Sequence, residues 1–449
     1  MAIITDDFKR RFVQTILEDI ADSAQHYYVG IGKADEWDSA DTVPTIANTL
    51  ANERNFRLAL QSVKKAEDTS YVVPRVNWTT GTIYSDFTNT QAGYPTQPYY
   101  VKTEDQQVYI CLEQGKDANG NAVSSTVKPT SVLTTASRLA DGYVWKFLYT
   151  IGATQSNKFL SGNYMPVRHV DSAGPADPAV DIEQFAIQAA AVKGQIANID
   201  VILKGSGYTS APTVSIVGNG DSAEATATIA SGEVVKVEMK DSAASNLYRP
   251  GQNYDYAEVK FTGGGGTGAS ASINLADDSG FGASAIIDLK STAMMFNSKP
   301  SGAENEDFII GQNFRQVGII RNPLDSADNN YVSETGSALT YMQLSAVGVV
   351  FTADKTILGS TSGAKAYVNT FDSDKIYYHQ DDDTGFIAFQ SGEGITETNG
   401  SGSGTIGTGT QALAADINKF TGQIFYIDNR AAIERSAAQT EDLKVIIQL

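Results

Sequence analysis

The sequence contains little of what several common classes of protein require. It has one cysteine, Cys111, so it can form no internal disulfide and no metal site built from several thiolates. Its three histidines, His26, His169 and His379, lie far apart, and none belongs to an H-x-x-x-H or C-x-x-C pattern. We expect them to be ordinary structural residues. The chain also lacks a G-x-S-x-G motif and a G-x-x-x-x-G-K-[ST] phosphate loop, so these motifs identify no catalytic residue and no cofactor.

Long apolar runs and basic patches are also lacking. No run approaches the length of a membrane span, and the first residues, MAIITDDFKRRF, lack the apolar stretch of a signal peptide. The formal net charge is −19, which repels a phosphate backbone, so nucleic acid is not an expected partner. We therefore expect a protein that does not insert into membranes and that is assembled in a reducing cytoplasm.

The chain does contain the patterns of a few helices followed by many short strands. A helix is predicted near the N-terminus, where apolar residues recur every four positions at Phe8, Phe12, Ile16 and Ile20, and Val13 and Leu17 widen this stripe. A second helix is predicted from Pro44 to about Ala66. Most later segments alternate Val, Ile and Tyr with polar residues and predict strands. The expected fold class is α+β, mainly antiparallel β, with helices at the N-terminus.

A glycine-rich segment at 261–273, FTGGGGTGASASI, matches the G-x-G-x-x-G pattern of dinucleotide-binding loops. Such a loop needs a helix after it, whereas ASASINL alternates with the period of a strand. The segment also belongs to a repeat, because 207–229 and 253–275 align with an offset of 45–46 residues. Each copy reads as strand, glycine-rich turn, strand. We therefore expect two hairpins and no bound cofactor.

Two polar segments near the C-terminal end predict turns and loops. Carboxylates cluster at 381–383 in DDDTG, where calcium is the cation to consider. The spacing does not fit an EF-hand loop, and a turn whose Asp side chains bond the backbone is the favoured interpretation. The segment at 399–410, NGSGSGTIGTGT, has the composition of a mobile loop.

Five segments, taken in order, carry a more specific resemblance. They read VGIGKADEWDS (29–39), VPRVNW (73–78), DGYVWKFL (141–148), FRQVGIIRNPL (314–324) and GQIFYIDNRAAIERSAAQTEDLKVIIQL (422–449). Together they resemble the baseplate wedge protein of T4-like contractile-tailed bacteriophages, of the gene-product-eight type. The resemblance covers roughly 1–170, 308–341 and 415–449, about half of the chain.

The resemblance implies a discontinuous core that is interrupted by two β-rich insertions. The expected order is a first core part at 1–187, an inserted β-repeat module at 188–300, a second core part at 301–344, a small β-rich insertion at 345–412 that ends in the Gly/Ser loop, and C-terminal core strands at 413–449. The resemblance further implies a non-enzymatic structural subunit of the virion, located in the tail baseplate. Its partners would be a second copy of itself and other wedge subunits, during assembly and during the rearrangement that host attachment triggers.

The candidate structural and interface residues all lie in the family-like segments. The three tryptophans of the chain are among them, because large aromatic side chains often anchor cores or interfaces. Arginines in these segments are expected to form charge-assisted hydrogen bonds, and X-Pro pairs to form rigid turns. We expect core and turn roles for most of them and interface roles for a minority. The set is Trp37, Pro74, Arg75, Trp78, Tyr143, Trp145, Arg321, Asn322, Pro323, Asn429 and Arg430.

An alternative from another class stays open. The β-repeat segment and the 21 tyrosines would also suit a glycan-binding or glycan-cleaving tail fibre or spike protein. Paired catalytic carboxylates of that class come from distant strands, so the sequence alone neither supports nor excludes them.

Overall fold

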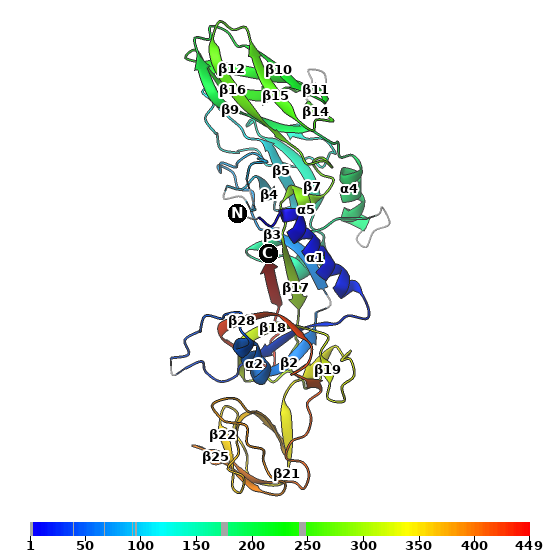
Figure 1. Cartoon of the computed structure of the whole chain (residues 1–449), viewed down its shortest axis with the longest axis vertical. Helices are drawn as coiled ribbons and strands as arrows, with labels where there is room; N and C mark the ends of the chain where they lie inside the picture. The colour runs from blue at the N-terminus through cyan, green and yellow to red at the C-terminus, as the bar shows by residue number, and fades with distance from the viewer. Residues whose placement is uncertain are drawn as a thin grey trace. The chain divides into compact units, whose positions relative to one another are not determined.

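The computed structural model describes residues 3–38, 40–66, 68–91, 93–94, 97–171, 178–241 and 248–449. Antiparallel strands dominate it and helices are few, which confirms the predicted α+β, mainly β class. The chain divides into two compact units (Figure 1). Unit 1 comprises Met1–Gln14, Ser70–Met295 and Ile446–Leu449, and unit 2 comprises Thr15–Thr69 and Phe296–Val445. None of the helices in the described ranges is long and apolar enough to cross a membrane.

Unit 2 contains a five-stranded antiparallel sheet with the order β20-β2-β1-β18-β28. Its central pair joins Gly30 directly to Gly318, and Gly318 in turn lies opposite Ile427. The sheet therefore joins strands from the beginning, the middle and the end of the chain. Their bounds are β1 Tyr27–Gly32, β2 Leu60–Lys65, β18 Asn313–Arg321, β20 Thr335–Ser337 and β28 Gln423–Glu434.

Helix α2 (Leu50–Ala59) places the fully buried Phe56 ring on the central glycines of this sheet. A Cβ atom at Gly318 would lie 2.4 Å from Cζ of Phe56, and one at Gly30 would lie 3.6 Å from the same atom and 2.7 Å from Leu60 Cδ1. Any larger residue at Gly318 would displace the ring, because close-packed interiors have no room for an extra methyl group. The glycine pair thus sets how closely α2 approaches the sheet.

The predicted helix from Pro44 to Ala66 is wrong over much of its length. The helix occupies only Leu50–Ala59, where Thr49 caps it by accepting a hydrogen bond from the Asn52 amide at 3.2 Å. The next residues form strand β2, which pairs with β1 on one side and β20 on the other. Pairing with two distant strands outweighs the local helical pattern, because strand formation depends strongly on tertiary context.

Helix α1 (Asp6–Ala21) forms as predicted, and part of its predicted apolar stripe is buried. Val13 and Ile16 are buried, whereas Phe8 and Phe12 are 63% and 45% exposed. A spacing of four residues advances about 40° around the helix at each step, so Phe8 and Ile20 lie about 120° apart. Phe8 and Phe12 therefore lie at one edge of the stripe, outside its buried part.

Unit 2 also contains a closed barrel with the strand order β21-β24-β23-β22-β25-β26. Fully buried side chains such as Met342, Ile357, Val368 and Ile376 fill it. Strand β26 lies inside the segment predicted as a mobile loop, and this expectation is wrong because β26 pairs with β21 and β25. The bounds are β21 Thr340–Val349, β22 Thr356–Gly359, β23 Lys365–Asp372, β24 Lys375–His379, β25 Gly394–Thr398 and β26 Ser403–Ile406.

Two buried carboxylates of the barrel, Glu393 and Glu397, hold its turns together. Glu393 accepts hydrogen bonds from the Thr361 and Ser362 amides, both at 2.9 Å, and Glu397 accepts one from the Gly402 amide at 3.0 Å. Burial alone would raise the pKa of each carboxyl, but these backbone hydrogen bonds outweigh burial and lower the pKa. The charged form of each side chain therefore stabilises the barrel.

Unit 1 contains several antiparallel sheets with the orders β4-β5-β7-β6, β12-β13-β9-β16 and β10-β15. Their strands are β4 Tyr100–Lys102, β5 Gln107–Glu113, β6 Ser137–Arg138, β7 Val144–Thr150, β9 Ile196–Ser206, β10 Thr213–Gly218, β12 Ala225–Ala230, β13 Glu233–Met239, β15 Ala257–Thr262 and β16 Thr267–Leu275. One large cluster of buried residues joins these strands, and includes Ile110, Val144, Ile199 and Val234. Figure 1 shows the strands of the repeat, β10, β12, β15 and β16, gathered at one end of this unit.

The remaining elements are short or cross the boundary between the units. The sheet β29-β17-β3-β8 comprises β29 Leu443–Gln448, β17 Ala293–Ser298, β3 Asp68–Pro74 and β8 Tyr164–Val167. The chain passes from one unit to the other within α1, β3, β17 and β29. The others are α3 Ala153–Phe159, α4 Pro178–Ala189, α5 Ala285–Asp288, β11 Asp221–Ala223, β14 Pro250–Gln252, β19 Leu324–Asp325 and β27 Ile417–Asn418.

The two repeat copies exchange their strands instead of forming the two predicted hairpins. Strand β10 of the first copy pairs with β15 of the second, while β12 pairs with β13 and β16 with β9. The glycine-rich turns therefore connect different sheets. A strand follows the second turn, as predicted, and the glycines at 263, 264, 265 and 268 have φ between +73° and +82°. This conformation suits glycine and forms no helix start for a dinucleotide.

Each glycine-rich turn receives a buried tyrosine from the other copy. Tyr208 of the first copy lies on Gly266 of the second, where an added Cβ would be 2.5 Å from the ring. Tyr254 of the second copy lies on Gly220 of the first, where an added Cβ would be 2.4 Å from the ring. Glycine is needed in each turn because a larger residue would overlap the tyrosine ring of the other copy.

We predict that Gly266→Ala destabilises the protein by roughly 1–3 kcal/mol, because the new methyl group would overlap the Tyr208 ring. Gly162→Ala is the matched control in the same unit, since nothing lies within 4 Å of its added Cβ. Thermal and urea unfolding, followed by circular dichroism, measure both changes. Equal stability of the two variants would show that the contact between Tyr208 and Gly266 is unimportant.

We predict that Glu397→Gln weakens the barrel by roughly 1–3 kcal/mol at pH 7 by removing a charged hydrogen-bond acceptor. Because the pKa of Glu397 is lower in the folded state, its contribution is complete above its unfolded pKa of about 4.3 and is lost as pH falls through the folded value. The variant should therefore lose less stability than the native protein between pH 5 and pH 3. Urea unfolding and hydrogen exchange of barrel peptides measure this, with the exposed Glu36→Gln as control.

Candidate functional site

The candidate residues from the sequence lie in two groups in unit 1 and two groups in unit 2. In unit 1, an aromatic cluster contains Tyr143, which is fully buried and stacks on Trp145 with ring centroids 5.8 Å apart. The Tyr143 hydroxyl donates to the Val123 carbonyl at 2.7 Å. Trp78 packs against the same cluster and its Nε1 donates to Ser125 Oγ at 3.2 Å. These three side chains are part of the core of unit 1.

The second group in unit 1 lies at the end of strand β3. The carbonyl of Pro74 accepts a hydrogen bond from the Tyr100 hydroxyl at 2.9 Å. The next residue, Arg75, donates through Nη1 to the Ser161 carbonyl at 2.9 Å and through Nε to Asn77 at 2.9 Å. Arg75 therefore fixes a loop to the strand end and is partly buried while doing so.

In unit 2, Arg321 is held by a two-pronged hydrogen bond to Asp19 of α1. Its Nε and Nη2 atoms lie 2.7 and 3.1 Å from the two Asp19 oxygens, and the Tyr27 hydroxyl donates to Asp19 at 2.6 Å. Burial raises the pKa of Asp19, but the bonds from Tyr27 and Arg321 outweigh it and lower the pKa. Asp19 is thus charged, and the pair joins α1 to strands β1 and β18.

Asn322 and Pro323 complete this network as a turn. Asn322 has φ of +49°, and its side chain accepts from the His26 amide at 2.8 Å and donates to Gln25 at 2.6 Å. The Pro323 carbonyl accepts from the Tyr331 amide at 3.0 Å. Asparagine tolerates this left-handed backbone conformation better than most residues, which explains its place here.

The last group surrounds a pocket of about 270 Å³ in unit 2. Trp37 donates from Nε1 to the Arg430 carbonyl at 3.0 Å, and Lys33 lies over its ring at 5.6 Å. Asn429 donates to the Pro44 carbonyl at 3.0 Å and accepts from Gln316 at 2.9 Å. The Arg430 side chain pairs with Asp428 and is about half exposed. The pocket is lined by Trp37, Asn429, Lys33, Asn52, Gln316 and residues 381–383, among others.

The carboxylates at 381–383 form a turn, which confirms the favoured interpretation of this segment. One oxygen of Asp381 accepts from the Asp383 and Thr384 amides at 3.0 and 2.9 Å. Asp382 receives two hydrogen bonds from Arg54 of α2 at 2.8 and 3.0 Å. The turn thereby contacts α2 within unit 2.

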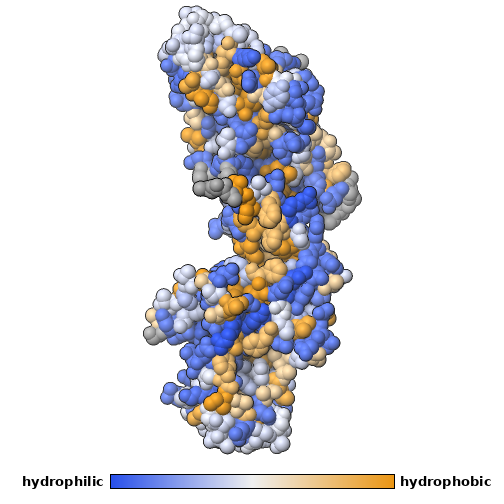
Figure 2. Space-filling view, in the orientation of Figure 1, coloured by the Kyte–Doolittle hydropathy of each residue, from blue (hydrophilic) through white to orange (hydrophobic). Residues whose placement is uncertain are grey.

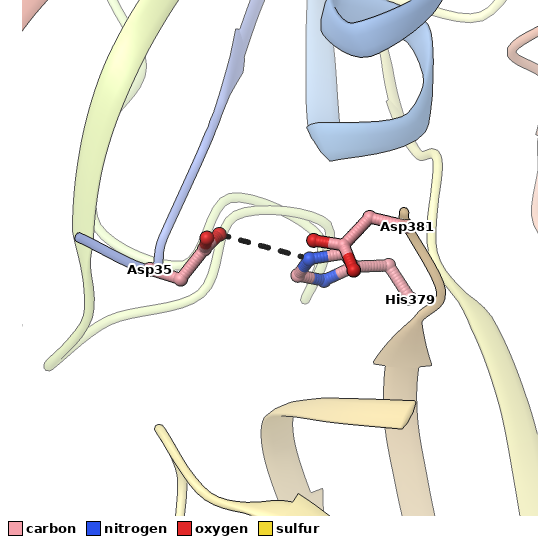
Figure 3. A group of neighbouring side chains, drawn as sticks. All are labelled: Asp35, His379 and Asp381. Atoms are coloured by element: carbon pink, nitrogen blue, oxygen red, sulfur yellow. Dashed lines mark ion pairs between the residues drawn. The ribbon is translucent and has the colours of Figure 1, made fainter. Parts of the chain in front are cut away.

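Next to this turn, His379 and Asp35 face each other, and Figure 3 shows them with Asp381, which lines the pocket. His379 ends strand β24 and is 2% exposed, while Asp35 follows β1. Nε2 of His379 lies 3.7 Å from Oδ1 of Asp35, and neither atom has a hydrogen-bond partner in the described part of the chain. Burial lowers the pKa of His379 to about 4, so the ring is neutral at pH 7.

Sequence reasoning missed this cluster. It predicted a turn at 381–383 and an ordinary structural role for His379. It assigned no role to Asp35 in the segment VGIGKADEWDS. The sequence carries no spacing signal for the cluster, because Asp35 and His379 come from distant strands. The fold alone brings the three donor atoms within 4.8 Å of one another.

A second, acidic pocket of about 590 Å³ lies elsewhere in unit 2 and contains Asp307 and Asp416. Burial raises the pKa of Asp307 to about 6; a hydrogen bond from Thr335 opposes the rise, and the adjacent Asp416 adds to it. A carboxyl with such a pKa can carry a proton near neutral pH. Tyr331 and Glu334 also line this pocket.

Comparison with protein-family models and with curated proteins found no match to this chain.

We predict that Arg321→Lys lowers the free energy of unfolding by roughly 1–3 kcal/mol, because lysine cannot make the two parallel bonds to Asp19. The matched control is Arg430→Lys, whose exposed pair with Asp428 should change stability by less than about 0.5 kcal/mol. Urea unfolding at low ionic strength compares the two variants. A larger loss of stability in Arg430→Lys than in Arg321→Lys would show that the two-pronged bond to Asp19 is not the more important contact.

Proposed function

We propose that this protein is a structural subunit of a phage tail baseplate wedge, which acts through contacts with a second copy of itself and with other wedge subunits. The observation that carries the proposal is the placement of the family-like segments. Segments 29–39, 314–324 and 422–449 contribute the neighbouring strands β1, β18 and β28 of one sheet. Segments 73–78 and 141–148 contribute Trp78, Tyr143 and Trp145 to one aromatic cluster.

The segments between the family-like ones add further β structure. Residues 188–300 include the exchanged repeat, whose strands share a hydrophobic core with β5 and β7, and residues 345–412 supply most of the closed barrel. The barrel has a core of its own, as an inserted module would. In the proposal, the inserted modules enlarge the surface that can contact neighbouring subunits.

Exposed apolar side chains also favour a protein that works through protein contacts. Phe8 and Phe12 lie one turn apart on α1 and are 63% and 45% exposed, and Ile4 just before the helix is 64% exposed. Figure 2 shows groups of apolar residues among hydrophilic ones on the face in view. Adjacent exposed aromatic residues are typical of interaction sites more than of bare solvent surfaces.

The proposal is tested on the particle that carries this chain. Immunogold labelling of intact virions should mark the baseplate, and the purified protein should have twice the mass of one chain by light scattering. A dimer that co-purifies with other wedge subunits would agree with the proposal. Label at fibre tips with a bare baseplate would overturn it.

The acidic pocket is the one observation that favours a glycan-cleaving protein instead. Asp307 has the raised pKa of a general acid, and Asp416 is a second carboxyl beside it. If the protein released reducing sugar from host surface polysaccharide, and Asp307→Asn abolished that release, the glycan-cleaving function would replace the wedge function. Unchanged polysaccharide after prolonged incubation would remove this alternative.

A further inference from the structure

We propose that Asp35, His379 and Asp381 bind a divalent transition-metal ion of the Zn²⁺ type, and that the ion fastens the closed barrel to the five-stranded sheet of unit 2. The proposal begins from the two buried atoms that face each other without a hydrogen bond, Nε2 of His379 and Oδ1 of Asp35. It does not depend on the role of the protein in a phage tail.

A chain of hydrogen bonds fixes which nitrogen of His379 carries the proton. The carboxylate of Asp354 can only accept, and it accepts from Nε2 of Gln312 at 2.8 Å. The amide oxygen of Gln312 therefore accepts, from Gln61 at 3.0 Å and from Nδ2 of Asn369 at 3.5 Å. Oδ1 of Asn369 then faces Nδ1 of His379 at 2.7 Å, so Nδ1 is the donor.

With its proton on Nδ1, the ring presents Nε2 to the carboxylate of Asp35. Nε2 and Oδ1 are both buried without a hydrogen-bond partner in the described part of the chain, and a cation between them would supply the partner that each lacks. The bond from Nδ1 to Asn369 is also the kind of outer contact that orients metal-binding histidines.

The distance between the two atoms fits a bridging ion better than a hydrogen bond. Two ligand atoms at about 2.1 Å from Zn²⁺ lie about 3.4 Å apart when they subtend a tetrahedral angle. The separation of 3.7 Å between Nε2 and Oδ1 is close to that value and too long for a hydrogen bond. Small side-chain movements would complete the geometry.

Asp381 supplies the third ligand. One of its oxygens is used by the turn, and its carboxylate lies beside the imidazole in Figure 3, within 4.8 Å of the other two donor atoms. Asp381 also lines the pocket of about 270 Å³, so water can reach a fourth position. One imidazole and two carboxylates with an open position suit Zn²⁺, Co²⁺ or Mn²⁺.

The surrounding charges leave the ligand atoms available. Lys33 pairs with Oδ2 of Asp35 and leaves Oδ1 free, while Arg54 neutralises Asp382. Lys419 is the other basic group nearby, and its ammonium donates to the Leu58 carbonyl at 2.8 Å. The ion would thus be a second positive partner of Asp35, beside Lys33, at a contact between barrel and sheet.

The test uses the full-length, tag-free protein after dialysis against EDTA. Isothermal titration with ZnCl₂ should show one equivalent bound, and Asp35→Asn and His379→Gln should each weaken binding by at least about tenfold. The matched control is Asp383→Asn, which changes one side chain of the same turn, keeps the backbone bond from residue 383 to Asp381, and should bind normally. Circular dichroism checks that each variant is folded.

Two measurements on the unmodified protein keep the proposal open to refutation even if a variant misfolds. Bound Co²⁺ should give the intense visible absorption of a tetrahedral site, and Zn²⁺ should slow hydrogen exchange in peptides that cover 33–38 and 379–385. No binding to the native protein, or equal weakening by Asp383→Asn, would overturn the proposal.

Discussion

The seating of the Phe56 ring on Gly30 and Gly318 is the contact on which the rest of unit 2 depends. It joins a helix to two strands that are distant in sequence, and it works only because both strands present bare backbone at that point. With β1 and β18 held together, β28 from the end of the chain can add to the sheet, and β2 can follow α2 directly. The barrel then begins just after β20 and returns before β27. One aromatic ring therefore organises segments from three parts of the chain.

Local features of the fold were predictable from the sequence, and features that depend on distant partners were not. The first helix and the strand after the four glycines were predicted because their patterns are complete within a few residues. The strand at 60–65 was missed because its identity depends on pairing with β1 and β20. The exchange of strands between repeat copies was missed for the same reason, since a hairpin and an exchanged pair have the same local sequence.

The candidate residues follow the same division. The turn at 381–383 was predicted from neighbouring residues, and it is present. The partner of Arg321, which is Asp19, and the partner of His379, which is Asp35, come from distant elements and gave no signal in the sequence. Most candidate side chains use their polar atoms within their own unit, as Tyr143, Arg75 and Asn322 do. Such residues determine the shape that a partner meets, while exposed side chains such as Phe8 and Phe12 provide surface for the contact itself.

The reciprocal placement of Tyr208 and Tyr254 has a consequence for how this part of the chain can change. The tyrosine of each repeat copy packs on the glycine-rich turn of the other copy. Neither copy is therefore complete by itself, and a single copy would need a second molecule to supply the missing half. Loss of one copy would leave the tyrosine of the other without its glycine turn, so the two copies have to be kept together.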